Sequence, residues 1–287
     1  MKRLLILCMV VCSTCQVFGQ SAGEFYKAAE HNLQLGEKRL ALTQLNRAAE
    51  ALTSSDHDSL YAGVAALFLD LNAPKQAIQL LAPKLDGRFP KEAHYVLMAR
   101  AYIKANHTDS ARAVAKEGLT LFPKSGALYR QYGITYSREL AFEKAASIWE
   151  RGVAAEPNYA MNYYHLAKFY SQTSEQLWTI LYGETFILLS DYTIQSRDIG
   201  RLVMAAYRQG IQIFSDSTRK VQLTTQGKVY AGGGRPVPNF EMAIQSNHAA
   251  AAAEVLKGRS HKKPITVFEL TDIRRLFLDY WFSQNLH

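Results

Sequence analysis

The protein has 287 residues, 48% of them hydrophobic, and a formal net charge of +8 at pH 7. That hydrophobic content excludes a chain that is disordered throughout. All three cysteines, Cys8, Cys12 and Cys15, lie near the N-terminus. The rest of the chain therefore offers no disulfide, no thiolate metal ligand and no cysteine nucleophile.

The first nineteen residues have the pattern of a secretory signal peptide. Lys2 and Arg3 precede the apolar stretch from Leu4 to Val11, and Gly19 provides a small residue before Gln20. The apolar stretch is much shorter than the roughly 20 residues that cross a bilayer. We therefore expect residues 1–19 to be cleaved and the protein to be exported, to the periplasm or outside the cell.

Lipidation of Cys15 is the alternative fate of this segment. Bacterial lipoprotein signals also end at a cysteine, but they carry Gly, Ala or Ser just before it, where this chain has Thr14. A soluble exported protein is thus favoured over a lipoprotein. No later segment predicts a transmembrane span, because the most apolar one, from Leu177 to Leu189, is short and contains Glu184.

The positive charge is concentrated in the C-terminal third. Residues 20–196 contain 18 Lys and Arg against 18 Asp and Glu, whereas residues 197–287 contain 13 against 7. The change in charge near residue 196 predicts two parts.

A period of 34 residues is the strongest pattern in the chain. Aromatic, small and proline positions of one stretch recur in the next, so that Tyr95, Met98, Ala99, Tyr102, Ala111, Gly118 and Pro123 correspond to Tyr129, Tyr132, Gly133, Tyr136, Ala145, Gly152 and Pro157. A fixed period of this length is typical of repeat proteins in which each unit packs on its neighbours.

This pattern resembles the tetratricopeptide repeat, or TPR, which has an aromatic, a Leu-Gly pair and a Tyr on one helix and Ala, an aromatic, Ala and Pro on and after the next. The resemblance implies an all-α solenoid of helix-turn-helix units. Small residues such as Ala99 and Gly133 let paired helices approach closely, and large ones such as Trp149 fill the space between pairs. Pro123 and Pro157 should end the second helix of their units.

We count five repeats with decreasing fidelity away from the centre. Their expected ranges are 22–57, 58–91, 92–125, 126–159 and 160–193. In the fifth unit Thr179 and Gly183 replace the expected Ala and aromatic, and no proline follows. This unit is predicted to be a modified end repeat.

Residues 194–287 are predicted to form a helical capping and basic region. An amphipathic helix over 198–214 should cover the apolar end of the solenoid. Residues 215–240 contain three consecutive glycines from Gly232 and the run from Pro236 to Pro238, which predict a mobile loop with a short strand or hairpin around Val221 to Tyr230.

Two further helices are expected, over 239–256 and 271–283. Thr271 or Asp272 is a candidate N-cap of the second. Its apolar positions form one stripe at helical spacing that should dock onto the helices after the repeats: Ile273, Leu276, Phe277, Tyr280 and Trp281.

The predicted binding surface is the inner face of the solenoid, formed by the first helix of each pair. Counting helical turns from the packed positions places nine side chains there. The candidate binding residues are Arg100, Lys104, Arg130, Arg138, Tyr164 and Lys168, with Val96, Ile134 and Met161 between them.

Five cations with aromatic and aliphatic neighbours would suit an extended acidic peptide or a free C-terminal carboxylate. This groove resembles the carboxylate-gripping grooves of some co-chaperone repeats. The alternative is an ordinary solvated face.

A second group of basic residues lies in the C-terminal region and suggests contact with an anionic surface: Lys257, Arg259, His261, Lys262 and Lys263. Export and the lack of interleaved aromatic residues argue against nucleic acid as that surface.

No catalytic, metal or cofactor pattern is present in the sequence. The eight histidines show no metal-ligand spacing, and the glycine run is not followed by Gly-Lys-Ser/Thr. The leading prediction is therefore a non-catalytic scaffold that holds a peptide segment or an envelope-complex subunit. A structural component of outer-membrane assembly machinery is the first alternative, and an enzyme with an unrecognised C-terminal catalytic domain is the second.

Overall fold

The structure is a computed structural model that describes residues 21–53, 56–85, 87, 90–213, 219–225, 229–230, 236–237, 240–259 and 264–283. The expected signal peptide and most of the expected loop over 215–240 lie outside these residues. The described residues fall into two compact units, one ending at Gly87 and one following it. Thirteen α-helices and four short strands occur in the described ranges, which confirms the predicted all-α fold.

The first unit contains two helix pairs, α1 (Ala22–Gln34) with α2 (Lys38–Ala51) and α3 (Asp58–Asp70) with α4 (Pro74–Leu85). A capping box between Ser21 and Glu24 begins α1. Small and aliphatic side chains, including Ala29, Ala41 and Leu81, are completely buried between the helices. The unit thus has a core of its own.

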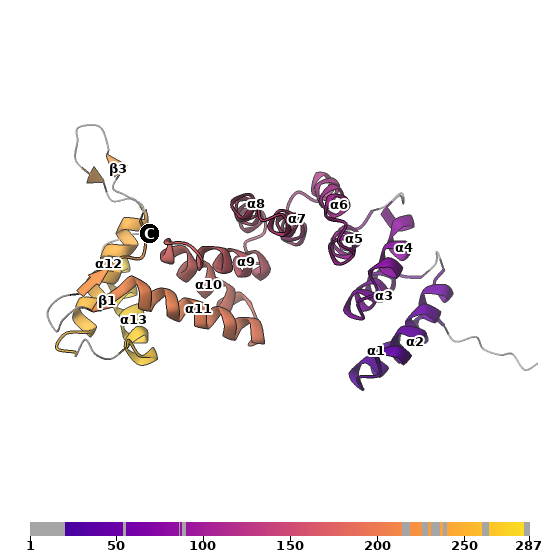
Figure 1. Cartoon of the computed structure of the whole chain (residues 1–287), viewed down its shortest axis with the longest axis horizontal. Helices are drawn as coiled ribbons and strands as arrows, with labels where there is room; N and C mark the ends of the chain where they lie inside the picture. The colour runs from indigo at the N-terminus through magenta and orange to yellow at the C-terminus, as the bar shows by residue number, and fades with distance from the viewer. Residues whose placement is uncertain are drawn as a thin grey trace, which may run out of the picture. The chain divides into compact units, whose positions relative to one another are not determined.

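The second unit begins with three further pairs (Figure 1): α5 (Glu92–Lys104) with α6 (Thr108–Leu121), α7 (Gly126–Arg138) with α8 (Phe142–Ala155), and α9 (Ala160–Tyr170) with α10 (Gln176–Leu189). Helices α6 and α8 end two residues before Pro123 and Pro157, as the repeat pattern predicts. Each pair packs on the next through contacts of α6 with α7 and α8 with α9.

The turns inside the pairs repeat a backbone conformation. Gly36, Asn72, Asn106 and Leu140 each follow the first helix of a pair and have φ values between 59° and 80°. This left-handed conformation suits Gly and is tolerated by Asn, but it is strained for Leu. The recurrence shows that the four N-terminal pairs share one turn geometry.

Polar contacts between successive pairs set their register. Ser125 caps α7 by accepting from the Leu128 amide, and its hydroxyl donates to Glu92 at the start of α5 over 2.6 Å. One pair later, the Asn162 side chain of α9 donates to the Gly126 carbonyl over 3.0 Å. The first helices of neighbouring pairs are therefore linked at corresponding ends.

The C-terminal region comprises α11 (Ile194–Gly210), the strands β1 (Ile211–Ile213), β2 (Arg219–Val221), β3 (Val229–Tyr230) and β4 (Pro236–Val237), and the helices α12 (Phe240–Val255) and α13 (Val267–Ser283). Strands β1 and β2 pair antiparallel, as do β3 and β4. The two hairpins flank the segment around Val221 to Tyr230, where the sequence predicts one hairpin.

Two expected helix limits are wrong. The helix expected over 198–214 spans 194–210, because Gly210 is followed by the β-branched residues of β1 and has Leu223 against it, where a Cβ atom would not fit. The last helix starts at Val267 rather than Thr271. Thr266 caps it, since its side chain accepts from the Glu269 amide and its own amide donates to Glu269.

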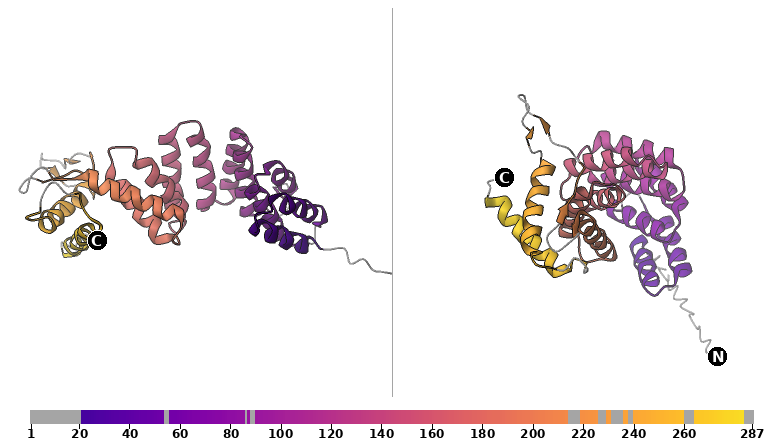
Figure 2. Two further views of the ribbon diagram at one scale, coloured as in Figure 1. Left: turned by 60° about the horizontal axis from the view of Figure 1, so that its bottom comes forward. Right: turned by 60° about the vertical axis from the view of Figure 1, so that its left-hand side comes forward.

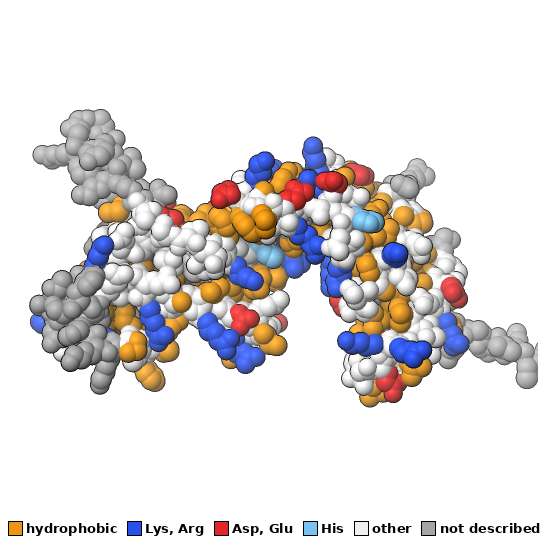
Figure 3. Space-filling model, viewed as in Figure 1, with side chains coloured by type: hydrophobic (Ala, Val, Ile, Leu, Met, Phe, Trp, Pro, Cys, Tyr) orange, Lys and Arg blue, Asp and Glu red, His pale blue; other side chains and the backbone are white. Residues whose placement is uncertain are grey.

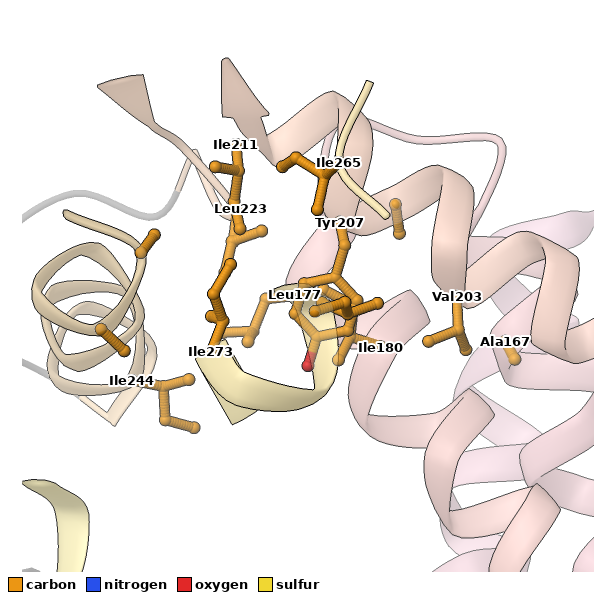
Figure 4. Close-up of a cluster of buried hydrophobic side chains, with 14 of the residues drawn as sticks. Ala167, Leu177, Ile180, Val203, Tyr207, Ile211, Leu223, Ile244, Ile265 and Ile273 are labelled. Atoms are coloured by element: carbon orange, nitrogen blue, oxygen red, sulfur yellow. The ribbon is translucent and has the colours of Figure 1, made fainter. Parts of the chain in front are cut away.

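The last repeat and the C-terminal helices share one hydrophobic core (Figure 4). It contains Leu177 and Ile180 of α10, Val203 and Tyr207 of α11, and Ile273 of α13. Helices α12 and α13 lie side by side (Figure 2). The predicted apolar stripe of α13 faces this core, with Ile273 fully buried and its other members partly buried against the cluster.

A chain of polar contacts runs from this core to Arg274 at the surface. The Tyr207 hydroxyl lies 3.2 Å from Glu184 and 3.5 Å from Nε2 of His248, and Arg274 Nε lies 3.0 Å from the same Glu184 oxygen. The His248 ring stacks on Phe277 with centroids 3.9 Å apart. Burial lowers the pKa of His248 to about 4.

This pKa gives the protein an expected sensitivity to acid. Because the folded-state pKa of His248 lies below its ordinary value of 6.5, its stabilising contribution is present above pH 6.5 and is lost as the pH falls toward 4. Burial raises the pKa of Glu184, which acts in the opposite direction. We expect urea unfolding at a series of pH values to show a smaller loss of stability on acidification for His248→Gln than for the wild type. Parallel pH profiles would contradict this assignment.

Among the described residues, no helix combines the length and the hydropathy needed to span a membrane.

Candidate functional site: an aromatic and basic cleft

A cleft of about 710 Å³ opens between α7, α8 and α9. Its walls combine aromatic rings, cationic side chains and small polar groups. The lining residues are Ile134, Ser137, Arg138, Phe142, Glu143, Trp149, Tyr164, His165, Lys168, Phe169, Gln172 and Thr173.

The aromatic part of the cleft is centred on Trp149, which is only 4% exposed. Its indole stacks on His165 with centroids 4.7 Å apart and an interplanar angle of 18°, and its Nε1 donates to the Arg130 carbonyl over 3.2 Å. A Cβ atom at Gly133 would lie 2.1 Å from Trp149 Nε1. The missing side chain of Gly133 therefore allows the indole to lie against α7.

His165 is held as a neutral ring beside Arg130. Arg130 Nε donates to His165 Nε2 over 3.3 Å, so the ring proton is on Nδ1. Burial, reinforced by the charges of Arg130 and Lys168, lowers the pKa of His165 to about 3. The ring thus contributes an uncharged aromatic surface to the cleft at neutral pH.

Two cations of the cleft are accessible to solvent. Arg138 and Lys168 are exposed. Arg138 Nη1 donates to the Asn106 side chain over 2.8 Å, and Lys168 Nζ lies 5.4 Å from the centroid of the Tyr164 ring. Glu143 is the one carboxylate among the lining residues. The rim therefore presents two cations against one acid.

The structure brings some of the six predicted binding residues together in this cleft. Arg138, Tyr164 and Lys168 line the cleft, and Arg130 contacts its histidine. Arg100 and Lys104 lie on α5, outside the lining residues. Figure 3 shows Lys and Arg side chains, with a histidine among them, on the face over α5, α7 and α9. The role of all six predicted residues in binding stays a prediction.

Sequence reasoning misses most of the aromatic lining. In the sequence His165 is one of several scattered histidines, the pattern assigns Trp149 to packing alone, and nothing singles out Phe169 or Phe142. The available signal is that His165 follows Tyr164, an expected inner-face residue, on a helix. Trp149 both packs between pairs and lines the cleft.

The remaining predicted features give no second site of this kind. Within the described ranges, no group of three or more His, Asp or Glu residues could hold a metal ion. Of the predicted basic cluster in the C-terminal region, residues 260–263 lie outside the described ranges. Arg259 forms an ion pair with Glu269 and is therefore not available as an open cation.

The geometry defines the class of this protein: a solenoid of paired helices with a cleft where one pair, α7 and α8, meets the first helix of the next, α9. A TPR protein from Thermus thermophilus aligns with 64% of this chain over its whole length, with a TM-score of 0.51 and 16% identity. A TPR protein from Parabacteroides merdae aligns with 64% of this chain and 72% of its own, with a TM-score of 0.52 and 15% identity.

This likeness identifies the fold as that of tetratricopeptide-repeat proteins and confirms the resemblance found in the sequence. No protein-family model matches the sequence, and no curated protein matches it.

Proposed function

We propose that the protein is a non-catalytic interaction module that binds a peptide segment of another protein in the cleft between α7, α8 and α9. The observation that carries this proposal is the combination in one cleft of a buried Trp149–His165 stack with the exposed cations Arg138 and Lys168. Peptide sites commonly join an apolar surface for one side chain with charged groups that fix orientation.

The charge of the rim favours an acidic peptide. A carboxylate between Arg138 and Lys168 would form charge-assisted hydrogen bonds, and an aliphatic or aromatic side chain beside it would cover Tyr164 and Phe142. His165 cannot add a positive charge at neutral pH, because its pKa is about 3. The selectivity for acid therefore rests on the two rim cations.

Paired charge reversal tests this proposal. We expect fluorescently labelled peptides of about ten residues that contain Glu and Phe to bind the wild-type protein, and Arg138→Glu combined with Lys168→Glu to weaken binding at least about tenfold. Fluorescence anisotropy measures the affinity. Lys116→Glu combined with Lys124→Glu, two sites outside the lining residues, is the charge-matched control. Equal affinities for all three proteins would contradict the proposal.

Export to the periplasm or outside the cell is part of this proposal, and it is supported by the N-terminal pattern of charge and hydropathy. An intact mass of the protein recovered from its producing cell would show cleavage before Gln20. A mass that instead carries a lipid on Cys15 would replace the soluble module by an anchored one.

A further inference from the structure

A second groove, separate from the cleft, runs along α11. It has a volume of about 660 Å³, and its floor is formed by Gly200, Met204 and Ala205 of α11 and by Val267 at the start of α13. A smaller hollow of about 190 Å³ shares Gly200, Met204 and Val267 with it and extends to Leu188 at the end of α10. The apolar surface is therefore continuous across three helices.

The floor is open to a partner. Val267 is 62% exposed, and Leu188 in the adjoining hollow is 84% exposed. A Cβ atom at Gly200 would meet no heavy atom within 4 Å, although Gly200 lies in the middle of a helix.

Three arginines line the groove: Arg197, Arg201 and Arg208. Their spacing of four and seven residues places them within about 40° of one another around the helix and over roughly 16 Å of its length. Arg201 pairs with Asp198 over 3.0 Å, and Arg208 donates to the Ile265 carbonyl. Among the described residues, no carboxylate lies within ion-pair distance of Arg197 or Arg208.

We propose that this groove, here called the α11 groove, binds an amphipathic helix of a partner protein that carries acidic residues along one edge. Charge complementarity identifies the occupant: the arginine row lies beside an apolar floor, and residues 197–287 contain 13 basic against 7 acidic residues. Helices commonly place an apolar face in such grooves, with charges at the edge. The row of three arginines spans about 16 Å along α11, a length that matches an acidic row on a partner helix.

The position of Gly200 provides a specific test. Gly200→Leu fills the floor, whereas Gly200→Ala adds a single methyl group into open space. The probe is a labelled helical peptide of about 14 residues built from Ala and Leu with Glu along one edge, and the matched peptide has Gln in place of Glu. Anisotropy titrations should show binding of the Glu peptide to the wild type and to Gly200→Ala. Binding should be weaker by at least about tenfold for Gly200→Leu and for Arg197→Glu combined with Arg201→Glu.

Several results would overturn the proposal. These are no binding of the Glu peptide up to about 1 mM, equal affinity for the Gln peptide, unchanged binding by Gly200→Leu, or binding of wild-type protein to phosphatidylglycerol vesicles without binding of the peptide. The cleft variant Arg138→Glu combined with Lys168→Glu should keep full affinity for the helical peptide. If the cleft variant instead binds the helical peptide more weakly, the peptide binds in the cleft, and the assignment of the α11 groove as its site is wrong.

Discussion

Replacing Ile273 by alanine should lower the free energy of unfolding by roughly 2–5 kcal/mol. Ile273 is completely buried in the core that the last repeat shares with the C-terminal helices. Truncation removes buried methyl groups and leaves a cavity between elements that are distant in sequence. The substitution should therefore destabilise the last repeat as well as α13.

Hydrogen exchange followed by mass spectrometry measures this coupling. In Ile273→Ala, we expect faster amide exchange in peptides from α10 and α11 as well as from α12 and α13. Leu278→Ala is the matched control, because Leu278 lies on the same helix and is 50% exposed. An increase confined to α13 would contradict a shared core.

Substituting alanine for Gly133 should also be strongly destabilising, although alanine is normally the better helix former. The added Cβ would lie 2.1 Å from Trp149 Nε1 and 2.5 Å from its Cδ1. The indole must move, which breaks its hydrogen bond to the Arg130 carbonyl and its stack on His165. Overpacking of this kind costs roughly 1–3 kcal/mol, and the lost hydrogen bond adds about 1 kcal/mol.

Gly200→Ala is the natural control for this substitution. Gly200 is also inside a helix, but open space surrounds its missing side chain, so alanine there should stabilise the protein by roughly 0.5–1 kcal/mol. Urea unfolding compares the two variants. Equal effects of the same sign at both positions would contradict the packing described for Trp149.

The central repeats could be predicted because their constraints are local and periodic. Tyr95 and Tyr129, or Pro123 and Pro157, recur at 34 residues, and each marks a helix position that every unit must provide. The turn positions Gly36, Asn72 and Asn106 follow nearly the same period. They mark the turns of the first three pairs independently of the aromatic and proline positions of the central repeats.

The C-terminal region was predicted less well because its limits depend on distant residues. Helix α11 stops at Gly210, where Leu223 occupies the space of a side chain. The following segment is held by Glu175, which accepts from the Thr224 hydroxyl over 2.5 Å, and by Gln245, which accepts from the Leu223 amide over 2.7 Å. No local sequence pattern predicts contacts between residues this far apart.

The sequence predicts only part of the candidate cleft, because the rest depends on contacts between distant residues. Helical spacing placed Arg138, Tyr164 and Lys168 on one face, and the structure brings them to one cleft. The stack of Trp149 on His165 joins α8 to α9 across neighbouring pairs, and only the packing of those pairs creates it. The aromatic floor of the cleft can therefore be identified only from the structure, whereas the residues of its charged rim can be predicted from helical spacing in the sequence.

Mapping where a peptide binds tests the central claim most directly. Hydrogen exchange of the wild-type protein, measured with and without the Glu- and Phe-containing peptide, should show protection concentrated in α7, the start of α8 and α9, with Arg138→Glu combined with Lys168→Glu removing it. Protection elsewhere in the chain, with these three helices unchanged, would contradict the assignment of the cleft as the binding site.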